Sequence, residues 1–120
     1  MKIQGTSIIG FNAAPKDGES TKAINPTTGK EIEPPFYSVD SGSVERAAAL
    51  ASQAFATYSK KSGTERAAFL REIAVQIEDL GDVLVQRAMQ ETGLPEGRIK
   101  GETGRTTGQL RLFATLAEEG

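Results

Sequence analysis

The chain has 120 residues, a formal net charge of −2 and 38% hydrophobic residues, values that fit one globular domain and leave no basic excess for binding nucleic acid. It contains no cysteine and no histidine, which excludes disulfides, thiolate nucleophiles, Ser-His triads and the common zinc ligand sets within this chain. Because no run approaches the ~18 apolar residues of a membrane span, we expect no membrane segment and a cytoplasmic location.

Residues 1–38 are rich in turn residues and short apolar runs, a pattern typical of strands joined by turns. The segment "NPTTG", from Asn25 to Gly29, predicts a turn because Pro26 presets its φ and the Asn25 side chain can bond nearby backbone. Gly29 tolerates the positive φ that such a turn needs. The flanking segments "TKAI" and "KEIE" therefore predict a short antiparallel β hairpin within residues 1–38.

From Asp40 onward, apolar residues recur at spacings of three and four, which predicts helices over residues 39–120. Breaks at Ser62–Gly63, at Gly81–Asp82 and at "TGLPEG" divide this segment into about four helices. The expected apolar stripes run over residues 44–58, 67–77 and 84–89, and along a last helix from about Glu96. The expected fold class is mainly α, preceded by the short β hairpin.

The last expected helix contains three interior glycines, each of which costs roughly 1 kcal/mol relative to alanine. At about 100° per residue, one side of this helix is expected to be buried, and it carries Ile99, Thr106, Leu110, Phe113 and Ala117. The opposite side carries Gly101, Gly104, Arg105, Gly108 and Leu112. The glycines therefore form a smooth stripe beside an arginine.

Two interpretations of this stripe stand. In the first, the glycines let another element pack closely, and Arg105 is a surface arginine. Glu102, three residues from Arg105 and four from Arg98, can form an ion pair with either. In the second, the stripe admits a ligand and Arg105 holds its carboxylate, because a guanidinium matches a carboxylate with two parallel hydrogen bonds. The spacing of the residues alone favours the first interpretation.

Several segments together resemble the N-terminal region of the aldehyde dehydrogenase superfamily. In order, they are "NPTTG" at residues 25–29, an alanine-rich helix ending in an aromatic residue at 44–58, "TERAAFL" at 64–70 and "ETG" at 91–93. The tail "EGRIKGETGRTTGQLRLFA" resembles the branch that oxidises α-ketoglutaric semialdehyde (2,5-dioxovalerate) and long-chain aldehydes with NAD(P). The resemblance covers nearly the whole chain and implies a part of an α/β aldehyde dehydrogenase-like fold.

Members of this family are several times longer, with a catalytic cysteine, a general-base glutamate, an oxyanion-hole asparagine and a Rossmann-like cofactor domain. The resemblance implies thiolate attack on an aldehyde, hydride transfer to NAD or NADP, and hydrolysis of the thioester. It also implies a homo-oligomer, a dimer or tetramer, when the protein is complete. Because this chain lacks cysteine, we expect a catalytically inert N-terminal fragment whose partner is the remainder of an aldehyde dehydrogenase chain.

The counterpart of the last helix lines the substrate tunnel in this family. By ordered alignment, Gly101 and Arg105 fall at tunnel-wall positions, so we expect both to bind substrate, with Arg105 holding the carboxylate of an acidic semialdehyde. No residue of this chain is expected to be catalytic or to bind the cofactor or a metal. The alternative function is a small helical interaction module without chemistry, which the absence of cysteine and histidine favours.

Overall fold

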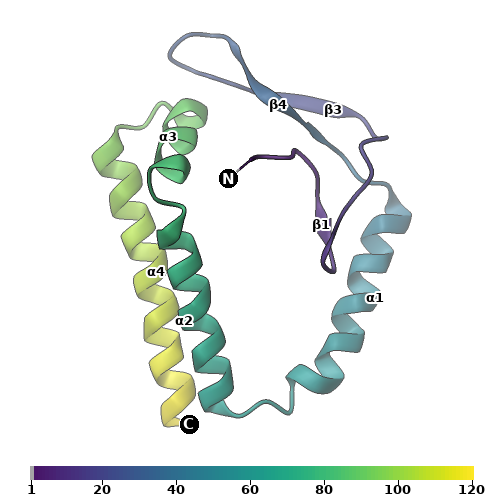
Figure 1. Cartoon of the computed structure of the whole chain (residues 1–120), viewed down its shortest axis with the longest axis vertical. Helices are drawn as coiled ribbons and strands as arrows, with labels where there is room; N and C mark the ends of the chain where they lie inside the picture. Colours follow the sequence, from purple (N-terminus) through teal and green to yellow (C-terminus); the bar gives the residue numbers. More distant parts are fainter. Residues whose placement is uncertain (1) are drawn as a thin grey trace. The chain divides into compact units, whose positions relative to one another are not determined.

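The structure, a computed structural model, describes residues 2–120 of the chain. Over this range it contains four strands in two antiparallel sheets and four α-helices (Figure 1), which confirms the predicted, mainly helical fold class. The residues form two compact units, residues 2–60 and residues 61–120. Every helix in the described part of the chain is too short or too polar to span a bilayer.

The first unit begins with a β hairpin that was not predicted. Strand β1, Ile8–Ile9, pairs antiparallel with β2, Asn12–Ala13, across a two-residue turn. Gly10 occupies the first turn position with a φ of 65°, as a two-residue turn of type II′ requires. Each strand has only two residues, so no alternating pattern could indicate the hairpin in advance.

The second hairpin is the predicted one. Strand β3, Ser20–Ile24, pairs antiparallel with β4, Glu31–Tyr37, on either side of the predicted turn. Asn25 accepts a hydrogen bond at Oδ1 from the Thr27 amide at 2.9 Å. Gly29 has a φ of 68°. Asn25 and Gly29 therefore have the roles that their residue types suggested.

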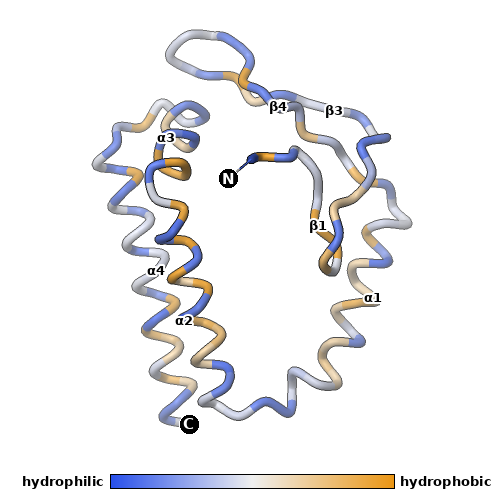
Figure 2. Tube along the Cα trace, viewed as in Figure 1, coloured by the Kyte–Doolittle hydropathy of each residue, from blue (hydrophilic) through white to orange (hydrophobic). Residues whose placement is uncertain are grey.

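Helix α1, Ser41–Tyr58, is capped by Asp40, because Oδ1 of Asp40 accepts a hydrogen bond from the Ser43 amide at 2.7 Å. This bond lowers the pKa of the Asp40 carboxyl. No residue of α1 is buried by the rest of the described chain; Val44 is 58% exposed and Phe55 is 68% exposed. Apolar residues recur along the helix (Figure 2), so its predicted apolar stripe is present but remains largely exposed within the described chain.

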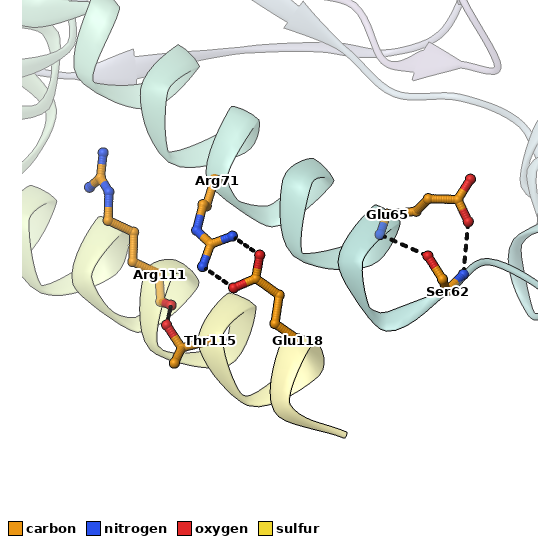
Figure 3. A network of polar contacts seen from close by, with 6 residues as sticks. All are labelled: Ser62, Glu65, Arg71, Arg111, Thr115 and Glu118. Atoms are coloured by element: carbon orange, nitrogen blue, oxygen red, sulfur yellow. Dashed lines mark hydrogen bonds and ion pairs between the residues drawn. The ribbon is translucent and has the colours of Figure 1, made fainter.

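The second unit consists of α2, Gly63–Asp79, α3, Gly81–Thr92, and α4, Glu96–Glu119, which begin at the predicted breaks. A capping box opens α2: Ser62 Oγ accepts from the Glu65 amide at 3.1 Å, and Glu65 Oε2 accepts from the Ser62 amide at 2.8 Å (Figure 3). The bond from the Ser62 backbone is the main reason that the pKa of the Glu65 carboxyl is lowered.

Helices α2 and α4 pack side by side (Figure 1) and form most of the core of this unit. Small side chains line their contact: Ala67 and Ala74 of α2 and Ala114 of α4 are fully buried. At Gly63 the backbones come so close that an added Cβ would lie 2.0 Å from the Ala117 carbonyl oxygen. The seam between α2 and α4 is therefore narrow, and it is built by alanine and glycine.

The buried side of α4 lies about one residue away from the predicted side. Ile99 is buried as expected, but Thr107 and Ala114 occupy the seam, whereas Thr106 and Phe113 are exposed. The prediction was wrong for Thr106 and Phe113 because it followed hydrophobicity alone. A phenylalanine does not fit between helices that alanines hold this close, so smaller neighbours take the buried positions.

Candidate functional site

One side of the α2–α4 pair has a hollow with a volume of about 510 Å³, within the unit of residues 61–120. It is lined by the apolar residues Leu70, Leu110 and Phe113 and by the polar residues Glu102, Arg105, Thr106 and Gln109. All except Leu70 belong to α4, where they recur at spacings of three and four and so form one strip beside the seam. Because the seam excludes Phe113, its ring is left to line this hollow.

Arg105 lines the hollow and forms no ion pair with any residue in the range 2–120. Of the two arginines within reach of Glu102, it is Arg98 that forms the ion pair, with 2.8 Å between Oε1 and Nη2. Arg98 and Glu102 are four residues apart, a favourable spacing for a helical ion pair. The guanidinium donors of Arg105 are therefore available to an anion that enters the hollow.

The three glycines of the stripe, Gly101, Gly104 and Gly108, are exposed on the side of α4 that was predicted to lie away from the core. A Cβ added at any of them would meet no other part of the described chain within 4 Å. The packing interpretation therefore has no partner for the stripe among residues 2–120. Gly101 precedes Arg105 by about one helical turn and is not one of the residues that line the hollow.

Two bidentate ion pairs join α2 to α4. Both Nη atoms of Arg71 donate to the Glu118 carboxylate, at 2.6 and 2.7 Å (Figure 3), and Arg111 binds Glu78 at the same distances. In each pair the arginine lowers the pKa of the carboxyl group. Because these side chains are partly exposed, each pair contributes little to the free energy of unfolding.

The sequence pattern pointed to Arg105 but not to most of its neighbours in the hollow. Leu70 was assigned to the apolar stripe of α2, and Phe113 to the buried side of α4. The sequence signal that indicates Gln109 is its spacing of four residues from Arg105, which places it on the same strip of the helix.

The chain belongs to the aldehyde dehydrogenase family, because the model of that family matches residues 13–120. Among the similar curated proteins, alpha-ketoglutaric semialdehyde dehydrogenase 2 of Azospirillum brasilense is 44% identical over 121 residues. The alpha-ketoglutaric semialdehyde dehydrogenase of Acinetobacter baylyi is 43% identical over 116 residues. These alignments cover 100% and 97% of this chain but 23% and 22% of the relatives, so the chain spans less than a quarter of their length. The resemblance to this family and branch is thereby confirmed.

The residues of this chain do not fit the nicotinamide cofactor that the family implies. A dinucleotide binds at the carboxyl ends of parallel strands, next to the N-terminus of a crossover helix. Both sheets in the described residues are instead two-stranded and antiparallel.

Proposed function

We propose that this chain is part of an NAD- or NADP-dependent aldehyde dehydrogenase that oxidises an acidic semialdehyde, such as α-ketoglutaric semialdehyde, to a carboxylate. Family membership and the names of the two relatives support the reaction and the substrate class. The remainder of the enzyme supplies the catalytic cysteine and the cofactor site, and the complete protein is a cytoplasmic homo-oligomer.

The observation that carries the proposal is the position of Arg105. It is an exposed guanidinium without an ion pair among the described residues, and it lines a hollow that is otherwise largely apolar. The carboxylate of a semialdehyde binds Arg105 through two parallel hydrogen bonds. The methylene groups of the substrate contact Leu110 and Phe113, while Gly101 leaves the approach to Arg105 free of side-chain bulk.

In this proposal Arg105 positions the substrate and takes no part in bond making. Holding the carboxylate at one end restricts the motion of the aldehyde at the other end, which favours attack by a nucleophile that the rest of the enzyme supplies. A neutral aldehyde of the same length lacks the carboxylate, so it gains nothing from Arg105.

The test is to replace Arg105 in the complete enzyme. Arg105→Ala is expected to raise KM for an acidic semialdehyde by about 10- to 100-fold, the effect of losing hydrogen bonds to a charged group, and to leave KM for a neutral aldehyde unchanged. Arg105→Lys is expected to restore part of the loss, because it keeps the charge but not the planar fork. Equal effects on the acidic and the neutral substrate would contradict the proposal.

The alternative function, a non-catalytic helical interaction module, gains no support from the family match, which extends over residues 13–120.

A further inference from the structure

We propose that Gln109 is a specificity-determining residue that donates a hydrogen bond to the 2-oxo group of the substrate, next to the carboxylate on Arg105. Gln109 would then favour 2-oxo acid semialdehydes over semialdehydes that carry a methylene at the same position. This inference rests on the proposed function, because it needs Arg105 to hold the carboxylate.

The first support is the placement of the two side chains. Arg105 and Gln109 both line the hollow of about 510 Å³ on α4. They are four residues apart, so their Cβ atoms lie about 5 to 6 Å apart on one face of the helix. Two long side chains with this separation can converge on neighbouring groups of one small molecule. In a 2-oxo acid, the carboxylate carbon and the ketone carbon are directly bonded.

The second support is that Gln109 is the remaining uncommitted donor in the hollow. The side chains of Leu70, Leu110 and Phe113 have no polar atoms, and an ionised glutamate side chain such as that of Glu102 only accepts hydrogen bonds. The hydroxyl of Thr106 donates to the Glu102 carbonyl oxygen at 3.0 Å. Within residues 2–120, Gln109 forms no side-chain hydrogen bond, so both N–H groups of its amide are available.

The chemistry of the amide suits a ketone oxygen. A neutral Nε2 donor recognises a neutral acceptor without requiring a charge on the substrate, and its hydrogen bond complements the charged contact at Arg105. A substrate with a methylene at this position accepts no hydrogen bond from the amide, which lowers its relative binding. The two side chains thus recognise adjacent groups of one substrate.

The experiment measures kcat/KM of the complete enzyme with two substrates that differ only at the second carbon, 2,5-dioxopentanoate and 5-oxopentanoate. Gln109→Met keeps the length of the side chain and removes its donors. It is expected to lower kcat/KM for 2,5-dioxopentanoate by about 3- to 10-fold and to leave 5-oxopentanoate unchanged. Gln90→Met is the matched control, because Gln90 is exposed on α3 and does not line the hollow, and it should leave both values unchanged.

The outcomes separate this inference from the proposed function. A neutral aldehyde of similar length reports whether the Gln109→Met enzyme is folded and active, and its kcat/KM should not change. If Arg105→Ala discriminates acidic from neutral substrates but Gln109→Met affects both acidic substrates equally, or neither, only the role of Gln109 is overturned. If Arg105→Ala affects acidic and neutral substrates alike, the proposed function itself fails.

Discussion

Glycines in the second unit have two opposite structural roles. At Gly63 the hydrogen in place of a side chain permits the contact between α2 and α4, because a Cβ would lie 2.0 Å from a carbonyl oxygen. At Gly101 a Cβ would meet nothing within 4 Å, and the helix is weakened without a packing gain among the described residues. Replacing glycine by alanine is therefore expected to have opposite effects on stability at Gly63 and at Gly101.

Gly63→Ala is expected to lower the free energy of unfolding of the chain by about 1 to 3 kcal/mol, because the carbonyl of Ala117 belongs to the backbone and must shift. Gly101→Ala is the matched control and is expected to raise the free energy of unfolding by up to about 1 kcal/mol, since alanine is the better helix former. Urea unfolding followed by far-UV circular dichroism measures both. Destabilisation of similar size in the two variants would disprove this contrast.

At the scale of single residues, the sequence was most informative where a residue type has a narrow physical role. The turn residues Asn25 and Gly29 and the cap at Asp40 were predictable because each acts through its immediate neighbours. Arg105 could be singled out as an unusual residue beside glycines. The sequence could not show that Arg105 forms no ion pair, because Glu102 lies within reach of both Arg98 and Arg105. Only the structure shows that Glu102 pairs with Arg98.

The helices of the second unit depend on one another through their seam. The breaks in the sequence predicted where α2, α3 and α4 begin, since breaks are local signals. Hydrophobic periodicity did not predict which side of α4 is buried. That side is decided by the width of the seam and not by the hydrophobicity of α4 itself. The hollow could not be predicted for the same reason, as Phe113 lines it only when smaller residues fill the seam.

The ion pairs between α2 and α4 predict how the stability of this unit depends on pH. The pKa values of Glu78 and Glu118 are lowered by Arg111 and Arg71 in the folded state. Their contribution to stability is therefore present above the unfolded pKa of about 4.3 and is lost as pH falls through the lower folded values. The two ion pairs are therefore lost, through protonation of the glutamates, at a pH below the usual pKa of a glutamate side chain.

We expect Glu78→Gln to flatten the decrease in the free energy of unfolding between about pH 5 and pH 3, because this carboxylate can no longer be protonated. The loss of stability should be smaller at high salt, which screens partly exposed pairs. Glu119→Gln is the control, since Glu119 has no ion pair among the described residues. An unchanged acid limb in the Glu78 variant would show that the Arg111 pair is not maintained in solution.

At the scale of the whole molecule, the two units differ in how far they are stabilised by their own contacts. In the unit of residues 61–120, α2, α3 and α4 each contribute buried residues. In the unit of residues 2–60, the buried residues are Gly5, Ile9 and Ala14, and α1 has none. Most helical stability in proteins comes from the packing of an amphipathic face, so α1 is the helix of the described chain with the least support from packing.

Two peptides, residues 2–60 and residues 61–120, test this difference. The second is expected to be largely helical, because its helices bury residues against one another, whereas α1 is expected to be largely unfolded in the first. Far-UV circular dichroism of the two peptides measures the helix content of each. A residues 2–60 peptide with the helix content of a complete α1 would contradict this expectation.

The pairing of α2 with the end of α4 has a consequence for how the protein is made. Arg71 and Glu118, which bind each other, are 47 residues apart in the sequence. At ribosomal rates, roughly 2 to 9 s pass between the synthesis of these two residues. During that interval the alanine face of α2 has no α4 to cover it, while the capping box at Ser62 is already complete. The nascent chain must therefore begin this unit with local helix formation and close it only when the last turn of α4 has left the ribosome.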